Sequence, residues 1–357
     1  MLERYGWSEE LQRQFTTCAD PGLLPARVII QQRGLYVVVC ALGEMSAGLS
    51  GRFMQDAADG DFPVAGDWVA VAARPNEGRA TIKQLLPRSS VFRRRAAGPG
   101  APRAQVVAAN VDVALLLASL NADLSVRRLE RYLAAAWEGN ADPVIVLTKS
   151  DMCDDIEPLK AAIEAVAFGV PVHVISALTG EGLEPLARHL TVGKTAVLLG
   201  SSGVGKSTLV NALAGKTLMH TQAVVEGDSL GRHTTTHREL IMLPSGALIL
   251  DTPGMRELGL YEADSGVSTA FADVETLAAA CRFHDCRHGS EPGCAVQAAL
   301  ADGTLDRARW NSYGKLQREI AFEERKNDPR ARAEARKVWL RRSKNYRAQK
   351  KFREREE

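Results

Sequence analysis

The chain contains one segment, residues 200–207, whose residue types and spacing suit a polyphosphate ligand. It reads Gly-Ser-Ser-Gly-Val-Gly-Lys-Ser and fits the pattern G-x-x-x-x-G-K-[ST]. Its glycines would let backbone N–H groups turn toward a β-phosphate, and a following helix would present its positive N-terminal end to the same anion. Lys206 would neutralise charge on the β- and γ-phosphates during catalysis, and Ser207 would offer its hydroxyl to Mg²⁺. The expected contacts to the triphosphate are Gly200, Ser201, Ser202, Gly203, Val204, Gly205, Lys206, Ser207 and Thr208.

The flanking residues supply the strand and the helix that such a loop requires. Residues 195–199 form a short apolar run typical of a buried strand, and residues 208–214 carry apolar side chains at helical spacing before Gly215. Upstream of the loop, from residue 105, strand and helix patterns alternate. The patterns predict strands at 111–117, 143–147 and 170–175, and helices at 126–137 and 155–168. This alternation predicts a parallel sheet covered by helices on both faces.

Two motifs that follow predicted strands suit a guanine base. Residues 148–151 read Thr-Lys-Ser-Asp and fit the pattern [NT]-K-x-D, in which the Asp accepts hydrogen bonds from the guanine N1–H and 2-amino groups. Thr148 stands where Asn is usual, so guanine selectivity would depend mainly on Asp151, which also disfavours an ATPase of related fold. The next strand is followed by Ser-Ala, which fits the supporting base-contact motif. The expected base contacts are Thr148, Lys149, Ser150, Asp151, Ser176 and Ala177.

Two segments beyond the phosphate loop suit the γ-phosphate and its metal ion. Residues 231–237 read Gly-Arg-His-Thr-Thr-Thr-His without helical or strand periodicity, which predicts a mobile switch loop. Thr234, Thr235 and Thr236 could each close over Mg²⁺, and we take Thr235 for this role. A hairpin predicted at 239–243 and 247–250 ends in a D-x-x-G pattern, in which Asp251 would hold Mg²⁺ and the Gly254 amide would contact the γ-phosphate.

The order of these motifs differs from that of ordinary GTPases, where the phosphate loop comes first. Here the base motifs precede the phosphate loop, and the two γ-phosphate motifs follow it. A parallel sheet tolerates such a rotation if the old termini are joined and a new break is made in a surface loop. The order therefore predicts a circularly permuted GTPase whose second switch leads directly into the C-terminal region.

The C-terminal region contains three of the six cysteines, all within residues 281–294. A chain with a phosphate loop is most simply cytosolic, so such a cluster favours a metal over disulfides. Cys281, Cys286 and Cys294 with one histidine would form a tetrahedral Cys₃His zinc site, which would be structural because all four positions are filled. On spacing alone, both His284 and His288 could complete it.

The basic C-terminal end of the chain indicates a polyanionic partner, and the N-terminal end favours a barrel of a kind that often binds nucleic acid. Residues 25–86 contain strand patterns at 26–30, 35–40, 66–72 and 80–86, which favour a small barrel of the OB type. Residues 87–100 include three consecutive arginines and favour a solvated linker, with a phosphate-contacting strip as the alternative. Residues 323–357 contain 14 Lys/Arg and 7 Asp/Glu with interleaved aromatics, which favour an RNA-binding tail over a merely solvated helix.

These patterns predict a multidomain chain, with an N-terminal OB-fold β-barrel, a central α/β circularly permuted P-loop GTPase, and a C-terminal, mostly helical, zinc-binding domain. The expected parts are a leader at 1–24, the barrel at 25–95, the GTPase domain at 96–270, the zinc-binding domain at 271–322 and the basic tail at 323–357. A signal-peptide pattern is missing, and no apolar run approaches the ~20 residues of a membrane span. We therefore expect a cytoplasmic protein with no membrane partner. We separately expect a monomer.

Taken together, the rotated motif order, the barrel, the loop at 231–236 and the cysteine cluster resemble the ribosome small-subunit-dependent GTPase A family, across nearly the whole chain. The resemblance implies a late-acting assembly factor that binds the immature small ribosomal subunit and its rRNA and hydrolyses GTP in a ribosome-stimulated manner. It also implies His288, rather than His284, as the fourth zinc ligand. The alternative is an RNA-binding placement factor in which GTP is chiefly a docking switch.

The residue that orients the attacking water is not the usual one. Many GTPases carry a Gln after the D-x-x-G glycine, but this chain has Met255, whose thioether cannot orient water. Intrinsic turnover should therefore be slow. His233 is the candidate by its position and by the family resemblance, and a group supplied by the ribosome is the alternative.

Overall fold

The computed structural model describes residues 1–32, 34–57, 62–95, 104–121, 124–219, 238–251 and 264–327. The chain divides into two compact units. Unit 1 comprises Met1–Gly259 with Ser265–Ala272, and unit 2 comprises Leu260–Asp264 with Asp273–Glu357.

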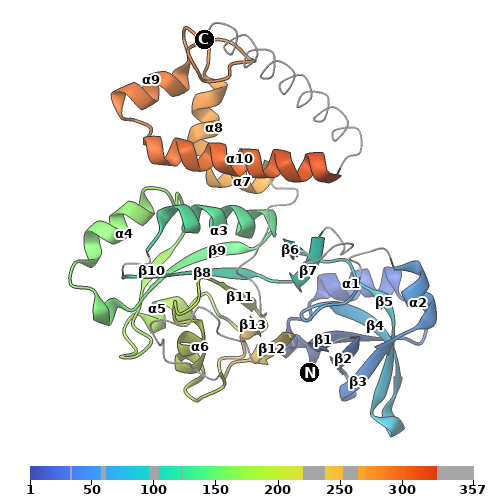
Figure 1. The fold of residues 1–357 in the computed structure, drawn as a ribbon. Helices are drawn as coiled ribbons and strands as arrows, with labels where there is room; N and C mark the ends of the chain where they lie inside the picture. The colour runs from blue at the N-terminus through green and yellow to red at the C-terminus, as the bar shows by residue number, and fades with distance from the viewer. Residues whose placement is uncertain are drawn as a thin grey trace, which may run out of the picture. The chain divides into compact units, whose positions relative to one another are not determined.

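Unit 1 begins with a leader and a closed five-stranded barrel (Figure 1). The leader contains η1 (Leu2–Tyr5) and α1 (Glu9–Cys18), and α2 (Gly51–Asp56) lies between strands β3 and β4. The barrel strands are β1 (Leu24–Gln32), β2 (Leu35–Cys40), β3 (Gly43–Leu49), β4 (Trp68–Arg74) and β5 (Arg79–Leu85). They pair in the order β1-β2-β3-β5-β4, and β4 pairs back onto β1. The apolar side chains of these strands form one buried cluster, as expected for an OB-fold.

The second part of unit 1 is a doubly wound α/β sheet. Its strands are β8 (Val113–Ser119), β9 (Asp142–Thr148), β10 (Val172–Val174), β11 (Thr195–Leu199), β12 (Arg238–Met242) and β13 (Leu248–Asp251). They lie in the order β10-β9-β8-β11-β13-β12, and only β12 runs antiparallel to its neighbour within this sheet. Every residue of β8 and β11 is buried, because helices cover both faces.

Four helices cover this sheet (Figure 1). In the figure, α3 (Val126–Glu138) and α4 (Ile156–Glu164) lie on one face, and α5 (Leu183–Ala187) and α6 (Lys206–Ala214) lie on the other. Ser125 caps α3 by accepting a hydrogen bond from the Arg128 N–H. A fifth helix, α7 (Asp264–Ala270), packs so closely on α3 that a Cβ at Gly266 would lie 2.4 Å from the Ala134 carbonyl oxygen.

The barrel and the α/β sheet are joined by strand pairing. Strand β12 pairs antiparallel with β1, with Ile30 opposite Glu239 and Gln31 opposite Arg238. Within the described part of the chain, the result is one sheet of eleven strands that runs from β10 into the barrel. Sequence patterns give no sign of this continuity.

Residues 87–100 were expected to form a solvated linker, but the described part of this segment, residues 87–95, contains a strand, which corrects that expectation. This strand, β6 (Val91–Arg95), pairs antiparallel with β7 (Ala104–Ala109) in a separate two-stranded sheet. Strand β6 pairs with no described barrel strand. The buried side chain of Phe92 explains why this basic segment is ordered.

Unit 2 is helical, with α8 (Ala272–Ala279), α9 (Ala295–Asp302) and α10 (Arg307–Asn327). Helix α10 is fastened to α8 by the Arg309 guanidinium, whose two 2.7 Å hydrogen bonds go to the Asp273 carboxylate. The Tyr313 hydroxyl adds a 2.8 Å bond to Glu275. The basic tail beyond residue 327 lies outside the described residues. In the described part of the chain, no helix combines the length and apolar character needed to cross a bilayer.

Candidate nucleotide site and metal centre

The predicted nucleotide motifs lie at one edge of the α/β sheet. The chain passes outward from β8 through β9 to β10, and then returns to β11 on the other side of β8. The crevice between β8 and β11 is therefore a topological switch point, which is where open α/β sheets bind ligands beyond the carboxyl ends of their strands. The phosphate loop follows β11, the Thr-Lys-Ser-Asp motif follows β9, and Asp251 ends β13, so all three reach this edge.

The phosphate loop has the shape of an anion cradle. Gly203 and Gly205 have φ angles of 71° and 103°, in the left-handed region that favours glycine. The nearest atom to a Cβ built on Gly205 would be the Thr148 hydroxyl oxygen at 3.9 Å. The Lys206 ammonium lies inside the loop, 2.8 Å from the Gly200 carbonyl oxygen and 2.6 Å from that of Ser201. The predicted contacts Ser207 and Thr208 lie in the first turn of α6.

The base motif is physically tied to the phosphate loop. The Thr148 hydroxyl is buried and donates a 2.6 Å hydrogen bond to the Val204 carbonyl oxygen. Sequence reasoning treated Thr148 as a weaker base contact, whereas the structure places its hydroxyl on the loop backbone. No spacing rule could have shown this bond, because it joins residues 56 positions apart.

The Asp151 carboxylate is held in place by the second base motif. The Ser176 hydroxyl donates a 2.6 Å hydrogen bond to Asp151 Oδ1 and accepts one from the Thr179 N–H at 3.2 Å. The Ser150 N–H donates to the Ile175 carbonyl oxygen at 3.2 Å, which joins the two strand ends. Asp151 itself is exposed, so its carboxylate can meet a base from solvent. The structure thus brings together the two motifs that the sequence analysis paired.

Several predicted site residues cannot be placed. His233, Thr234, Thr235, Thr236 and Gly254 lie outside the described residues. Asp251 is described. It is half-buried at the end of β13, where its backbone lies opposite that of Glu239 in the β12–β13 hairpin. Of the residues predicted to contact the triphosphate and its Mg²⁺, the structure therefore describes the phosphate loop, the start of α6 and Asp251.

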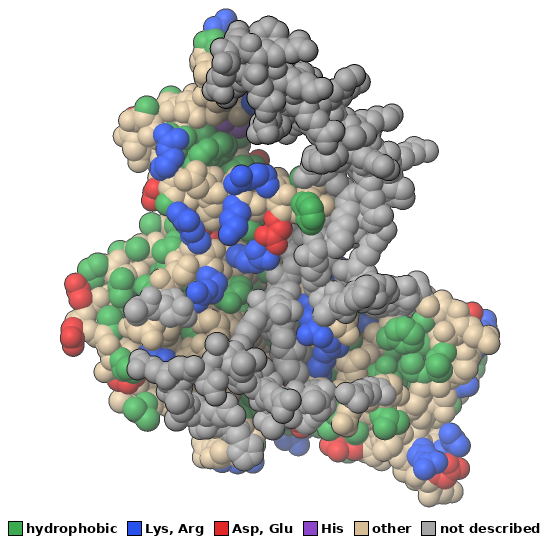
Figure 2. All heavy atoms as spheres, viewed as in Figure 1, with side chains coloured by type: hydrophobic (Ala, Val, Ile, Leu, Met, Phe, Trp, Pro, Cys, Tyr) green, Lys and Arg blue, Asp and Glu red, His purple; other side chains and the backbone are tan. Residues whose placement is uncertain are grey.

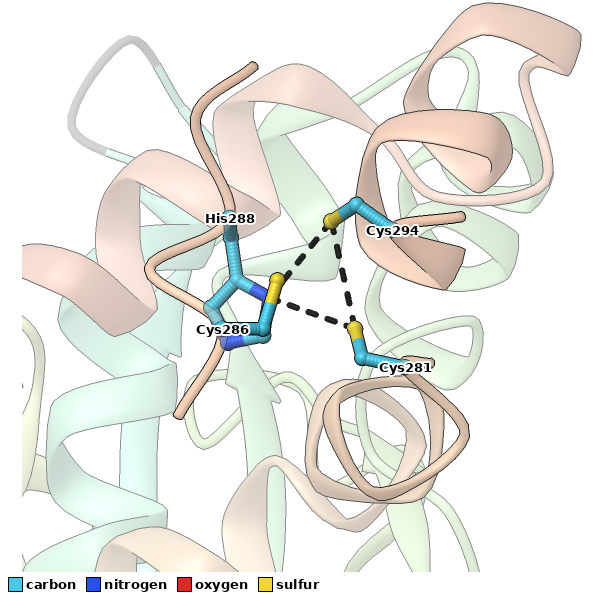
Figure 3. A group of neighbouring side chains, drawn as sticks. All are labelled: Cys281, Cys286, His288 and Cys294. Atoms are coloured by element: carbon cyan, nitrogen blue, oxygen red, sulfur yellow. Dashed lines mark hydrogen bonds between the residues drawn. The ribbon is translucent and has the colours of Figure 1, made fainter. Parts of the chain in front are cut away.

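The cysteine cluster forms a compact set of donor atoms (Figure 3). One ligand atom from each of Cys281, Cys286, His288 and Cys294 lies within 4.8 Å of the others. The Cys281 and Cys294 sulfurs are 3.9 Å apart, and His288 Nδ1 is 3.5 Å and 3.6 Å from them. Tetrahedral zinc with its usual bond lengths requires about 3.8 Å between sulfurs and about 3.6 Å between sulfur and nitrogen. The four residues therefore fit a zinc ion, and His284 is not part of this set.

Neighbouring groups orient the cluster. The Cys294 sulfur also caps α9 by accepting a 3.4 Å hydrogen bond from the Gln297 N–H. The Gln297 side chain donates to the His288 carbonyl oxygen at 2.6 Å. The Trp310 ring of α10 meets the His288 ring edge-on, with 5.5 Å between centroids. These supporting contacts come from α9 and α10, which the cysteine spacing does not indicate.

The fold and motif order define the protein class as a circularly permuted P-loop GTPase. Two solved structures agree: YjeQ from Thermotoga maritima has a TM-score of 0.62 and 26% identity, and covers 84% of this chain and 98% of its own. YloQ, described as a circularly permuted GTPase, has a TM-score of 0.60 and 25% identity, and covers 87% and 98%.

Sequence comparisons give the family. The family model for the RsgA GTPase matches residues 85–261. The small ribosomal subunit biogenesis GTPase RsgA of Opitutus terrae is 46% identical over 344 residues, covering 93% of this chain and 94% of the relative. The protein of the same name from Streptomyces coelicolor is 45% identical, covering 96% and 92%. The chain belongs to the RsgA GTPase family.

Proposed function

We propose that this protein binds the small ribosomal subunit late in its maturation and hydrolyses GTP to GDP and phosphate in a cycle that the subunit stimulates. The observation that carries the proposal is that the described GTPase motifs meet at one sheet edge in a rotated order, and the similar structure of YloQ is likewise described as a circularly permuted GTPase. The names of the relatives, small ribosomal subunit biogenesis GTPases, support the partner.

The described residues have separate roles in this proposal. Asp151, oriented by Ser176, reads the guanine edge, while Thr148 sets the distance between the base motif and the phosphate loop. Lys206 leaves the loop carbonyls to meet the β- and γ-phosphates. Mg²⁺, when bound with the nucleotide, neutralises phosphate charge, and Ser207 and Asp251 are the described residues that would hold it. Thr235, outside the described residues, is proposed as a further ligand.

A structural Zn²⁺ is proposed for the Cys₃His cluster. The ion would join the end of α8, the intervening loop and the start of α9, because Cys281 follows α8 and Cys294 caps α9. With four protein ligands it has no open position for substrate, so its contribution is to folding.

An RNA-binding role for unit 2 is supported by its charge. On the face drawn in Figure 2, Lys and Arg side chains predominate over Asp and Glu in unit 2. The described side chains of α10 include Arg307, Lys315 and Arg318, against one acid, Glu319. Basic side chains along a helix suit phosphate contacts, and the basic sequence beyond residue 327 continues the same pattern.

The test is GTP hydrolysis with and without isolated small ribosomal subunits, at a low and a high salt concentration. We expect slow turnover alone, a large stimulation at low salt and a steep loss of stimulation as salt rises, because phosphate contacts release counterions. Turnover that is indifferent to subunits at both salt concentrations contradicts the proposal.

The alternative, an RNA-binding placement factor with GTP as a docking switch, is distinguished by its requirement for hydrolysis. Lys206→Ala and Asp251→Ala should abolish turnover in either case. If these variants still promote subunit maturation in cells lacking the wild-type protein, placement alone is the function. If they bind subunits and are not released, the GTPase cycle is required.

A further inference from the structure

A buried arginine lies where the barrel meets the α/β sheet. Arg27, on barrel strand β1, is 2% exposed. Burial lowers its pKa to about 10, partly opposed by the charges of Asp112 and Asp67. Burying a cation costs free energy unless hydrogen bonds compensate it, so the partners of Arg27 show which parts of the fold it holds together.

The Arg27 guanidinium bonds to both parts of unit 1. On the barrel side, its Nε donates to the Gly66 carbonyl oxygen at 3.2 Å, and the group lies 5.1 Å from the centroid of the Trp68 ring. On the other side, its Nη2 donates to the Thr195 hydroxyl oxygen at 2.8 Å and to the Asn110 carbonyl oxygen at 3.1 Å. Its Nη1 bonds to the carbonyl oxygen of Tyr5 in the leader. One side chain thus joins the barrel, the leader and the α/β sheet.

The backbones at this junction are in direct contact. A Cβ on Gly66, in the barrel, would lie 2.4 Å from the Ala109 carbonyl oxygen at the end of β7. A Cβ on Gly6, in the leader, would lie 2.6 Å from the Gly193 carbonyl oxygen, two residues before β11. Neither position therefore has room for a side chain, so backbone packs directly on backbone at both points. The Arg27 hydrogen bonds therefore add to direct backbone contacts of the barrel and the leader with the rest of unit 1.

Thr195 makes this junction relevant to catalysis. It is the first residue of β11, and β11 leads directly into the phosphate loop at Gly200. Its N–H donates to Asp112 at 2.8 Å, and Asp112 also accepts from Lys194. The first residue of the P-loop strand is therefore held at two atoms: its hydroxyl oxygen accepts from Arg27 of the barrel, and its N–H donates to Asp112, just before β8.

We propose that Arg27 is a positioning residue, which fixes the barrel to the root of the P-loop strand so that a subunit held by the protein acts on the nucleotide site through the barrel. This rests on the proposed function, because it requires a subunit that stimulates hydrolysis. Because Arg27 is buried, it is placed to act through its neighbours, and its hydrogen-bond partners on the α/β side are Thr195 and Asn110.

The main variant is Arg27→Met, which keeps an unbranched side chain against Trp68 and removes the guanidinium. The neighbouring Asp67 keeps its own partner, because Arg88 binds it at 2.7 Å, so no buried carboxylate is orphaned. Gly66 keeps a donor in the Asn110 side chain at 3.2 Å. A milder variant, Thr195→Val, removes only the hydroxyl that accepts from Arg27. Arg52→Met is the matched control, because Arg52 is an exposed barrel arginine paired within α2 to Asp56.

The measurement is the ratio of GTP turnover with saturating small subunits to turnover without them, together with GDP affinity and subunit binding by co-sedimentation. Coupling between two sites typically changes an affinity or response by about 5- to 150-fold, so we expect Arg27→Met to lower the ratio by about tenfold. Basal turnover, GDP affinity and subunit binding should stay within about twofold of wild type, which is below the smallest usual coupling effect of about fivefold. Thr195→Val should lower the ratio less, and Arg52→Met should leave it unchanged.

The outcomes distinguish a failure of the proposed function from a failure of the positioning role of Arg27. If wild type is not stimulated by subunits, the proposed function fails, whatever Arg27 does. If wild type is stimulated and Arg27→Met keeps the full ratio, or loses basal and stimulated turnover in equal proportion, the positioning role is overturned. If Arg27→Met does not fold, Thr195→Val decides, and an unchanged ratio in that variant also overturns the role.

Discussion

At the scale of single residues, two side chains of the proposed base motifs, Thr148 and Asp151, are each held by a hydrogen bond to another motif. Asp151 illustrates this, since Ser176 holds one carboxylate oxygen while the carboxylate remains exposed. An Asp with one oxygen so engaged presents a defined hydrogen-bonding edge to a base.

Replacing Asp151 should change which base is bound. In Asp151→Asn, an amide replaces the acceptor pair, so it should favour xanthine, which presents a carbonyl where guanine has its amino group. Hydrogen bonds to charged groups contribute about 1.5–3 kcal/mol, so GTP affinity should fall roughly 10- to 100-fold. Titration with fluorescent GDP and XDP measures both affinities. Unchanged preference for guanine contradicts the base-site assignment, and Asp154→Asn, three positions away, is the control.

Replacing His233 tests the proposed water-orienting group. We expect His233→Ala to retain GDP affinity and to lose subunit-stimulated turnover by at least about 100-fold, the usual scale for a group that acts on the reacting water. Stopped-flow nucleotide binding and phosphate release measure the two quantities separately. Stimulated turnover at the wild-type level would instead assign the role to a group from the ribosome.

Sequence spacing proposed residues for a nucleotide site, because each motif is local. It also proposed the three cysteines of the metal cluster, whereas His288 was chosen over His284 by the family resemblance and does lie in the cluster. Sequence spacing could not predict the hydrogen bonds between motifs. Thr148 bonds to Val204, and Ser176 bonds to Asp151, only because parallel strands bring distant loops to one sheet edge. Arg27 gave no signal either, since a lone arginine in an apolar strand is not a motif.

At the scale of helices and strands, prediction succeeded where periodicity is strong and failed where pairing decides. The strands at residues 35–40 and 195–199 have the predicted bounds. Strand β3 was missed although Met45 and Ala47 alternate with the exposed Glu44 and Ser46, because the run contains two glycines and no β-branched residue. Its pairing with β2 and β5 holds it in the barrel. Strands β6 and β7 were missed because the arginines and the Gly-Pro-Gly run between them are typical of a linker.

A histidine pair gives the edge of the sheet a predicted pH dependence. His173 on β10 and His189 after α5 have their Nε2 atoms 2.9 Å apart. Burial, and secondly the proximity of His189, lowers the pKa of His173 below its ordinary 6.5. The unfolded chain then binds the proton more readily, so the stability that the neutral ring contributes is present above pH 6.5 and is lost as pH falls below it.

Thermal unfolding at pH 7.5 and 5.5 measures this effect. The wild-type Tm should fall more between these pH values than the Tm of His173→Asn, which lacks the titrating ring. Equal falls in the two proteins would mean that the pair does not contribute to the pH dependence. His284→Asn, at an exposed histidine outside this pair, serves as the control.

At the scale of the whole molecule, the two compact units separate the chemistry. The described nucleotide motifs belong to unit 1, and the metal cluster belongs to unit 2. Removal of a structural zinc with a chelator, or Cys281→Ser, should therefore destabilise unit 2, because metal binding energy is folding energy in such sites. GDP affinity should stay at the wild-type level, while a lower-temperature unfolding transition appears in calorimetry. Loss of GDP affinity on chelation would show that unit 1 depends on the metal.

The pairing of β12 with β1 has a consequence for how the chain is made. Gln31 and Arg238 are 207 residues apart and share a 2.8 Å hydrogen bond across the seam. During synthesis from the N-terminus, the barrel can close long before β12 leaves the ribosome. The Ile30–Gln31 end of β1, beyond the part that pairs with β4, must therefore wait unpaired. Open strand edges invite pairing with other chains. An isolated α/β domain without the barrel would expose the matching edge of β12, and it should aggregate more readily than the full chain.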